Sequence, residues 1–179
     1  GSVMTSFNEI NGIPAAANEW LVRDLLAKQW GIAGLVVSDY TAINELIPHG
    51  IAADEYEAAA EALKGGNHMD MVRDSYLNNL NRLVKDGKIK AEMIDAACKH
   101  VLEAKYKLGL FTDPYKYCNE QRAKTEIFTA ENRKVAREIA AQSFVLLKNN
   151  NNILPLKKTG TIAVVGPMAD TRENMPGTW

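Results

Sequence analysis

Three short apolar stretches recur in the first part of the chain, and each leads through polar residues into a helical pattern. They lie at Val3–Phe7, Ala33–Ser38 and Asn67–Met71. Each begins about 32 residues after the one before, the length of a strand, a crossover helix and a loop in a parallel sheet. Right-handed βα units in series form either a doubly wound sheet or part of a barrel. The spacing therefore predicts a helix-rich α/β fold with parallel strands.

The helices are predicted from apolar residues at helical spacing and from their end signals. After Asp54, Glu57 completes the pattern of a capping box, and Gly65–Gly66 ends that helix. Residues 109–128 show little periodicity and are expected to form an extended connection. The predicted helices cover residues 19–30, 55–64, 75–85, 91–108 and, from residue 129 or 130, a long amphipathic helix to 147.

A change in composition follows the last predicted helix. Residues 149–152 are four asparagines, typical of a linker, and Thr161–Pro167 repeats the pattern of a buried strand. One strand and a loop cannot fold as a domain, so we expect a boundary near residues 120–130 and a second domain cut off after it begins. The 179 residues are also too few for a complete (β/α)₈ barrel, which needs about 250.

Composition excludes several classes of protein. Lys plus Arg number 21 against 22 acids, for a net charge of −1, and no basic cluster predicts binding to nucleic acid. The longest apolar runs are far shorter than the ~20 residues that cross a bilayer, so no membrane partner is expected. The chain also begins without the charged-then-apolar pattern of an export signal.

Neither a cofactor nor a metal ion is expected. The three histidines, His49, His68 and His100, are scattered without ligand spacing, and no glycine-rich phosphate loop occurs. Cys98 lies in an apolar helical register and is predicted to be a buried thiol, with pairing to Cys118 as the alternative. Two cysteines alone make no disulfide framework.

Catalytic groups in parallel βα folds lie at the carboxyl ends of the strands. Asp39 is the strongest candidate, because it directly follows an uninterrupted apolar strand that would hold its carboxylate in place. The alternative interpretation is that Asp39 only caps the following turn. His68 and Asp70 lie in the weak third strand, with Asp70 near its end, and for both a structural role is the alternative to a catalytic one.

Several motifs, in collinear order from Val3 to Trp179, strongly resemble glycoside hydrolase family 3, and within it the periplasmic β-glucosidases of Gram-negative bacteria. The motifs are Phe7-Asn-Glu-Ile-Asn-Gly-Ile-Pro, Trp30-Gly-Ile-Ala-Gly-Leu-Val-Val-Ser-Asp-Tyr, Leu83-Val-Lys-Asp-Gly-Lys-Ile, Lys105-Tyr-Lys-Leu-Gly-Leu-Phe-Thr-Asp-Pro-Tyr, Ser143-Phe-Val-Leu-Leu-Lys-Asn, Leu154-Pro-Leu and Ile162-Ala-Val-Val-Gly-Pro.

The resemblance implies an architecture. Residues 3–120 would be the last three βα units of a TIM-type (β/α)₈ barrel. Residues 121–160 would form a linker and a helix, and residues 161–179 would be the first strand and loop of an α/β sandwich domain. The chain is thus expected to be a fragment of a two-domain enzyme.

The same resemblance assigns roles to residues. Asp39 falls on the family's nucleophile, at the end of the seventh barrel strand. Substrate contacts are implied for three positions: Tyr40, where relatives often have Trp or His; Phe7, which replaces a frequent Tyr; and Met69, in the eighth-strand motif.

The implied activity is that of a retaining exo-β-glucosidase acting on oligosaccharides or on aryl and alkyl β-glucosides in the periplasm. A β-xylosidase, another family 3 glycosidase, or a non-catalytic interaction module on the same scaffold is the alternative. The family's acid/base Glu and most groups that hold the sugar would lie outside these residues. We therefore expect the isolated chain to be inactive, and its open sheet edge to promote self-association.

Overall fold

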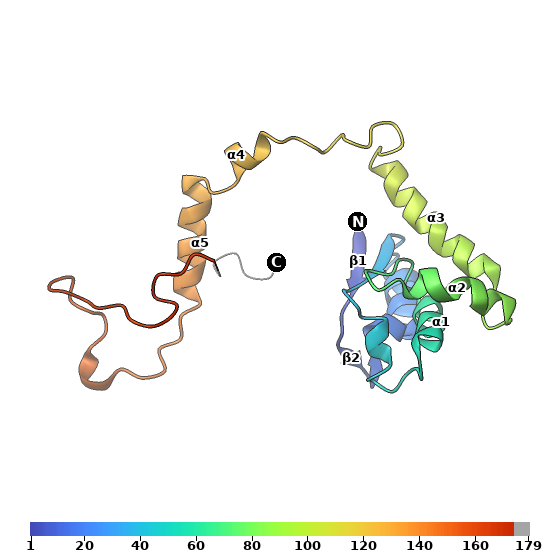
Figure 1. The fold of residues 1–179 in the computed structure, drawn as a ribbon, viewed down its shortest axis with the longest axis horizontal. Coiled ribbons are helices and arrows are strands. Elements are labelled where there is room, and N and C mark those ends of the chain that lie inside the picture. Colours follow the sequence, from blue (N-terminus) through green and yellow to red (C-terminus); the bar gives the residue numbers. More distant parts are fainter. Residues whose placement is uncertain (174–179) are drawn as a thin grey trace. The chain divides into compact units, whose positions relative to one another are not determined.

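The computed structural model describes residues 1–173 (Figure 1). The chain divides into two compact units, Gly1–Cys118 and the residues from Asn119 onward.

The first unit is built on a parallel pair of strands. β1 (Ser2–Thr5) pairs with β4 (Leu35–Ser38) in a register that places Thr5 opposite Ser38. The predicted parallel arrangement of the first two strands is thus confirmed. The third predicted strand is reduced to one bridge between Val37 and Met69, also parallel. Between β1 and β4, the polar stretch that follows Phe7 contains a small antiparallel hairpin, β2 (Glu9–Ile10) and β3 (Ile13–Pro14).

The predicted helices of this unit are present with nearly the expected bounds. Asp54 caps α1 (Glu55–Gly65) by accepting a hydrogen bond from the Glu57 amide at 2.9 Å, while the Glu57 carboxylate accepts one from the Ala53 amide. The predicted helix 19–30 is wound as a π-helix. The helices are η1 (Ala15–Ala17), η2 (Trp20–Gln29), η3 (Asn44–Leu46), α1 (Glu55–Gly65), α2 (Ser75–Lys85) and α3 (Ala91–Lys107).

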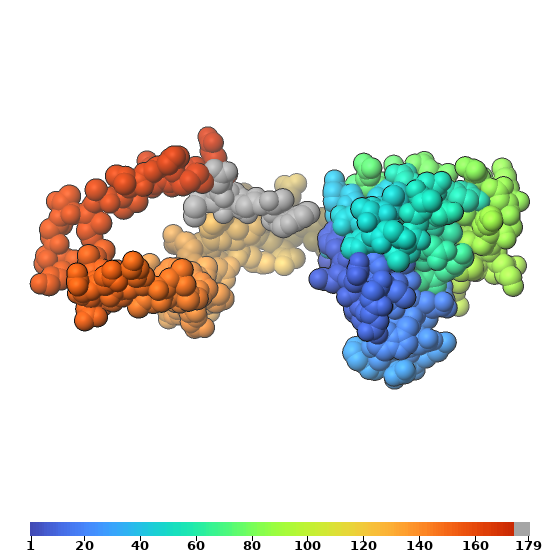
Figure 2. All heavy atoms as spheres, turned by 90° about the horizontal axis from the view of Figure 1, so that it is seen from below, coloured from blue at the N-terminus to red at the C-terminus, as the bar shows by residue number. Residues whose placement is uncertain are grey.

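The core of the first unit surrounds α1. Its alanines Ala58, Ala59 and Ala62 are fully buried, and their small side chains let α1 approach its neighbours closely. A Cβ added at Gly65 would meet the Ala17 backbone at 2.9 Å, so only glycine permits this contact. The space-filling view shows this part of the chain, coloured blue to green, as closely packed atoms (Figure 2).

The second unit contains short helices and extended chain. They are α4 (Arg122–Glu126), α5 (Ala130–Gln142) and η4 (Asn150–Asn152). Among residues 119–173 none is buried. Without a core, the predicted helix ends at Gln142 instead of residue 147, and Thr161–Pro167 forms no strand. The extended connection predicted for residues 109–128 is interrupted by α4. Residues 174–179, the end of the predicted second domain, lie outside the described residues.

Both cysteines are exposed and free, so the prediction of a buried Cys98 is wrong, and the alternative of a Cys98–Cys118 disulfide is not observed in the described residues. Cys98 lies on an exposed side of α3. The apolar pattern of this helix covers more than one side, so spacing alone did not identify the buried side. No helix within residues 1–173 is long and apolar enough to cross a membrane.

Candidate active site

The carboxyl ends of β1 and β4 meet at one edge of the sheet, together with residues 69–71. The Asp39 amide donates to the Thr5 carbonyl at 3.2 Å, which ties the end of β4 to the end of β1. On the other side, the Ser38 amide donates to the Met69 carbonyl at 2.9 Å, and the Met71 amide donates to Ser38 Oγ at 2.8 Å. Asp39 is therefore held from both sides through the backbone next to it.

The Asp39 carboxylate is half-buried and has one oxygen fixed. Oδ1 accepts a hydrogen bond from the Tyr40 amide at 2.6 Å, and Oδ2 has no hydrogen-bond partner among the described residues. The backbone reverses directly after this pair, since Thr41 has a φ of +62°, a conformation that a β-branched residue rarely adopts. A strained turn next to a half-held carboxylate is typical of functional sites.

The other predicted site residues lie around this edge with exposed side chains. Phe7 follows β1, and its side chain is 37% exposed; Tyr40 and Met69 are 47% and 44% exposed. The backbone of Met69 belongs to the edge itself. The Tyr40 amide donates to the Asp39 carboxylate, and the Met69 carbonyl accepts from the amide of Ser38, the residue before Asp39. Phe7 lies two residues beyond Thr5 and makes no hydrogen bond to this edge within the described residues.

A buried polar bridge next to the site was missed by sequence reasoning. Thr5 Oγ1 donates to Asn67 Oδ1 at 2.9 Å, and Asn67 Nδ2 donates to the Ala16 carbonyl. The Tyr76 hydroxyl also donates to the Asn67 carbonyl at 2.9 Å. Asn67 is completely buried. The available signal was a polar residue at the start of a stretch predicted to be a buried strand.

Asp70 has a structural role at this edge. Its Oδ2 accepts from the Tyr76 amide at 3.2 Å, at the start of α2, where the N-cap residue Asp74 makes no side-chain cap. Its Oδ1 is buried without a partner among the described residues. Burial raises the pKa of the Asp70 carboxyl, and the hydrogen bonds from the Tyr76 and Ser75 backbone oppose the rise. The interpretation of Asp70 as a hydrogen-bonded structural residue is supported.

The histidines also have structural partners. His68 Nδ1 accepts from the Val36 amide at 3.1 Å, and its ring stacks on His100. His49 Nδ1 lies 2.7 Å from Glu9 Oε1. Within the described part of the chain, no group of three or more His, Cys, Asp or Glu side chains could hold a metal ion.

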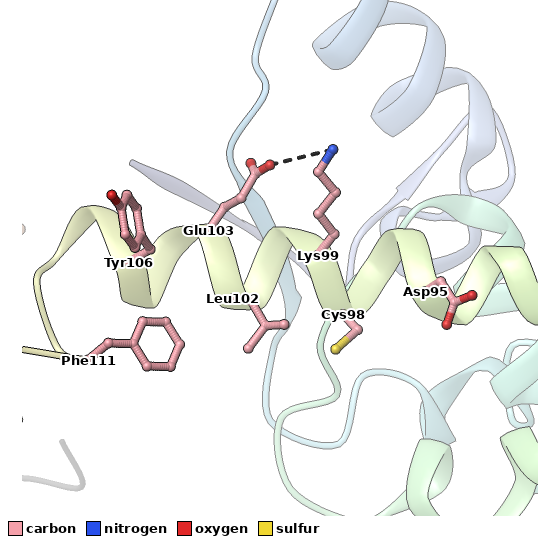
Figure 3. A pocket seen from close by; sticks show the side chains of 7 residues that line it. All are labelled: Asp95, Cys98, Lys99, Leu102, Glu103, Tyr106 and Phe111. Carbon is pink, nitrogen blue, oxygen red and sulfur yellow. Dashed lines mark ion pairs between the residues drawn. The ribbon is translucent and has the colours of Figure 1, made fainter.

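An apolar hollow of about 570 Å³ lies along α3, away from the strand ends (Figure 3). The close-up shows the ion pair of Lys99 with Glu103, 3.8 Å apart, on the side opposite Leu102 and Cys98. All of its lining residues fall within residues 95–111, and none follows a strand. This hollow is therefore not part of the candidate active site.

Comparisons with known proteins identify the family. Residues 1–104 match the glycosyl hydrolase family 3 N-terminal domain, and residues 144–179 match the C-terminal domain of the same family. The chain therefore belongs to glycoside hydrolase family 3.

Individual relatives agree with this assignment. The chain is 47% identical to the periplasmic β-glucosidase of Salmonella typhimurium, a match that covers 100% of this chain and 24% of that protein. It is 36% identical to a β-xylosidase of Formosa agariphila, over 100% of this chain and 26% of the relative. The crystal structure of a Listeria innocua β-glucosidase is similar with a TM-score of 0.74 at 39% identity, covering 94% of this chain and 23% of that one. The chain thus spans about a quarter of these relatives.

Proposed function

We propose that this chain carries the nucleophile of a retaining exo-β-glucosidase, and that Asp39 is that nucleophile. The observation that carries the proposal is the half-held carboxylate of Asp39. Tyr40 fixes one oxygen and leaves the other without a partner in residues 1–173, at the carboxyl edge of a parallel strand pair in a family 3 sequence.

The proposed chemistry is a double displacement. The Asp39 carboxylate attacks the anomeric carbon of a terminal β-glucosyl residue, and the bond from that carbon to the leaving oxygen breaks. An acid outside these residues protonates the leaving oxygen. Water, deprotonated by the same group, then attacks the covalent glycosyl-enzyme and releases glucose and free Asp39. Phe7, Tyr40 and Met69 would contact the sugar or the leaving group from the exposed side of the edge.

The architecture proposed with this activity follows the resemblance described above. Residues 3–120 would supply the last three βα units of a TIM-type barrel, residues 121–160 a linker and helix, and residues 161–179 the start of the second domain. The match of residues 144–179 to the family's C-terminal domain supports the last assignment. Retaining hydrolysis needs two carboxyl groups about 5–5.5 Å apart. We therefore propose that the chain alone is inactive.

Mechanism-based labelling tests the nucleophile. The whole protein is treated with a 2-deoxy-2-fluoro-β-glucosyl inactivator and digested, and the modified peptide is sequenced by mass spectrometry. We expect the label on Asp39, and none in the Asp39→Asn variant. The matched control is Asp70→Asn, which changes a carboxylate at the same edge and should still be labelled. A label on another residue rules out Asp39.

A β-xylosidase is the second candidate, because xylosidases from Formosa agariphila and Arabidopsis thaliana are 36% and 35% identical to this chain. The ratio of kcat/KM for 4-nitrophenyl β-glucoside to that for the β-xyloside separates the two. A glucosidase should prefer the glucoside at least tenfold. Sugar-bound structures of the Listeria innocua enzyme, with glucose and with laminaribiose, support the glucosidase.

Two further proposals concern the state of the chain. The name of the Salmonella relative supports a periplasmic location, which fractionation of cells expressing the whole protein would test. The free edge of β1 and the exposed Met4 side chain favour self-association of the isolated chain. Light scattering should then give a mass above that of one chain, and a monodisperse monomer would contradict this.

A further inference from the structure

The His68 side chain takes the place of a backbone hydrogen-bond acceptor beside β4. Its main-chain amide donates to the Val36 carbonyl at 2.8 Å, and its ring Nδ1 accepts from the Val36 amide at 3.1 Å. In a regular parallel ladder the Val36 amide would instead donate to a backbone carbonyl of the neighbouring segment. The His68 side chain therefore satisfies the amide of Val36 in β4, which explains why residues 67–71 form only one β-bridge to this strand among the described residues.

The hydrogen bond fixes the protonation state of the ring. A backbone amide can only donate, so His68 Nδ1 must be unprotonated and the proton of the neutral imidazole must lie on Nε2. Protonation of Nδ1 would point two donors at each other and remove the partner that the Val36 amide has within residues 1–173. The bond to β4 therefore exists only while His68 is neutral.

The surroundings of His68 favour the neutral ring. The His100 ring of α3 stacks on it, with the centroids 3.9 Å apart and the planes 5° from parallel. The Arg23 guanidinium of η2 is fixed nearby by the carbonyls of Leu63 and Lys64, at 3.0 and 2.6 Å. Burial, followed by His100 and Arg23, lowers the pKa of His68 to about 4.

Other charged groups line the hollows on either side of the two rings. The carboxylates among them favour protonation of His68 and the ammonium groups oppose it. They are Glu19 and Lys28 around η2, Lys64 from α1, and Lys90 and Glu92 at the start of α3.

We propose that His68 is a positioning residue for Asp39: its neutral ring holds β4 at Val36, and protonation of the ring loosens the strand there, although the backbone hydrogen bonds of residues 68 and 69 to β4 remain. The loosening reaches Asp39 because β4 has only four residues, and the Asp39 amide is bonded to Thr5 directly after them. The consequence for catalysis rests on the proposed role of Asp39 as the nucleophile.

The chain itself allows a direct test by NMR. The ¹⁵N shifts of the imidazoles and the amide-exchange protection of Val36 and Asp39 are measured from pH 7.5 to 3.5. In His68→Asn, Oδ1 can take the place of Nδ1 but does not titrate. In His68→Leu the acceptor is lost. His49→Asn removes a histidine at another place in the same unit and is the matched control.

We expect the His68 proton on Nε2 at pH 7 and titration of the ring near pH 4. Protection of the Val36 and Asp39 amides should fall at least tenfold as the ring is protonated. His68→Leu should show the same loss at pH 7, His68→Asn should keep its protection to pH 3.5, and His49→Asn should behave as the wild type. Titration of His68 at its ordinary pKa with unchanged protection would overturn the proposal, as would the same acid loss in His68→Asn.

Activity separates this proposal from the proposed function. In the whole protein, kcat for an aryl β-glucoside should fall on the acid side at least tenfold more in the wild type than in His68→Asn, with KM unchanged. If kcat falls equally with decreasing pH in the wild type and in His68→Asn, His68 does not position Asp39 for catalysis. If no version hydrolyses a glycoside, the proposed function fails, and the NMR result still decides whether His68 holds the Asp39 backbone.

Discussion

The buried bridge of Thr5 and Asn67 should be the most sensitive polar contact of the first unit. Asn67→Ala removes two hydrogen bonds and leaves Thr5 Oγ1 and the Ala16 carbonyl buried without their partner. Each buried polar group left unpaired costs about 1–3 kcal/mol. We therefore expect the free energy of unfolding to fall by about 2–6 kcal/mol.

A double-mutant cycle assigns this loss to the bridge. Thr5→Val keeps the shape of the side chain and leaves Asn67 Oδ1 unpaired, so it should cost about 1–2 kcal/mol. In the double variant the hydrogen bond between the two side chains is already absent. Its loss of stability should therefore be smaller than the sum of the two single losses by about 1–2 kcal/mol, within the range measured for residues in contact.

Urea unfolding of the chain, followed by circular dichroism, measures all four free energies. Asn78→Ala is the matched control, because Asn78 is exposed on α2, and surface changes of this kind stay within about 0.5 kcal/mol. An Asn67→Ala variant as stable as the control, or fully additive losses in the cycle, would refute the reasoning.

Three further predictions use the same unfolding assay. Gly66→Ala should cost about 1–3 kcal/mol more than Gly87→Ala, because both need a left-handed backbone but only at Gly66 would a Cβ meet a side chain, Val22 Cγ1 at 2.7 Å; equal losses would contradict this. Asp54→Ala removes the α1 cap and should cost about 1 kcal/mol, whereas an unchanged midpoint would show that the cap is unimportant. Burial raises the pKa of Asp70, so ionisation of its carboxyl opposes folding at neutral pH, and this penalty disappears as the pH falls below the raised pKa. The advantage in stability of Asp70→Asn over the wild type should therefore decrease from pH 7 to pH 4. An advantage that increases would show that folding lowers the pKa of Asp70 instead of raising it.

The helices of the first unit could be predicted because each carries its own signals. Asp54 and Glu57 mark the start of α1, glycines mark its end, and apolar spacing gives α2 and α3 nearly to the residue. These signals are local, and the buried faces they predict have partners within the same unit. Spacing could not show which side of α3 faces that core, and the prediction for Cys98 was wrong for this reason.

The second unit shows where such patterns are insufficient. Phe144–Leu147 and Thr161–Pro167 are apolar enough for a buried helix and a buried strand. A strand forms only against another strand, and an apolar helical face is stabilised mainly by packing. Among residues 119–173 there is no buried side chain, and Leu147 is 91% exposed. The apolar pattern indicates that these residues would form a helix and a strand if they packed against a core. Residues 119–173 contain no such core.

The apolar strand pattern alone does not show what holds the candidate site in place. Asp39 was predicted as the candidate nucleophile because it directly follows an apolar strand, but two paired strands of four residues are only marginally stable by themselves. Side chains from residues 67–68 supply the remaining support: the Asn67 amide holds the end of β1, and the His68 ring holds the middle of β4. Ser38 Oγ in turn accepts from the amide of Met71. Polar residues in a weak strand pattern were therefore the informative feature, since they replace the backbone ladder that a regular third strand would have provided.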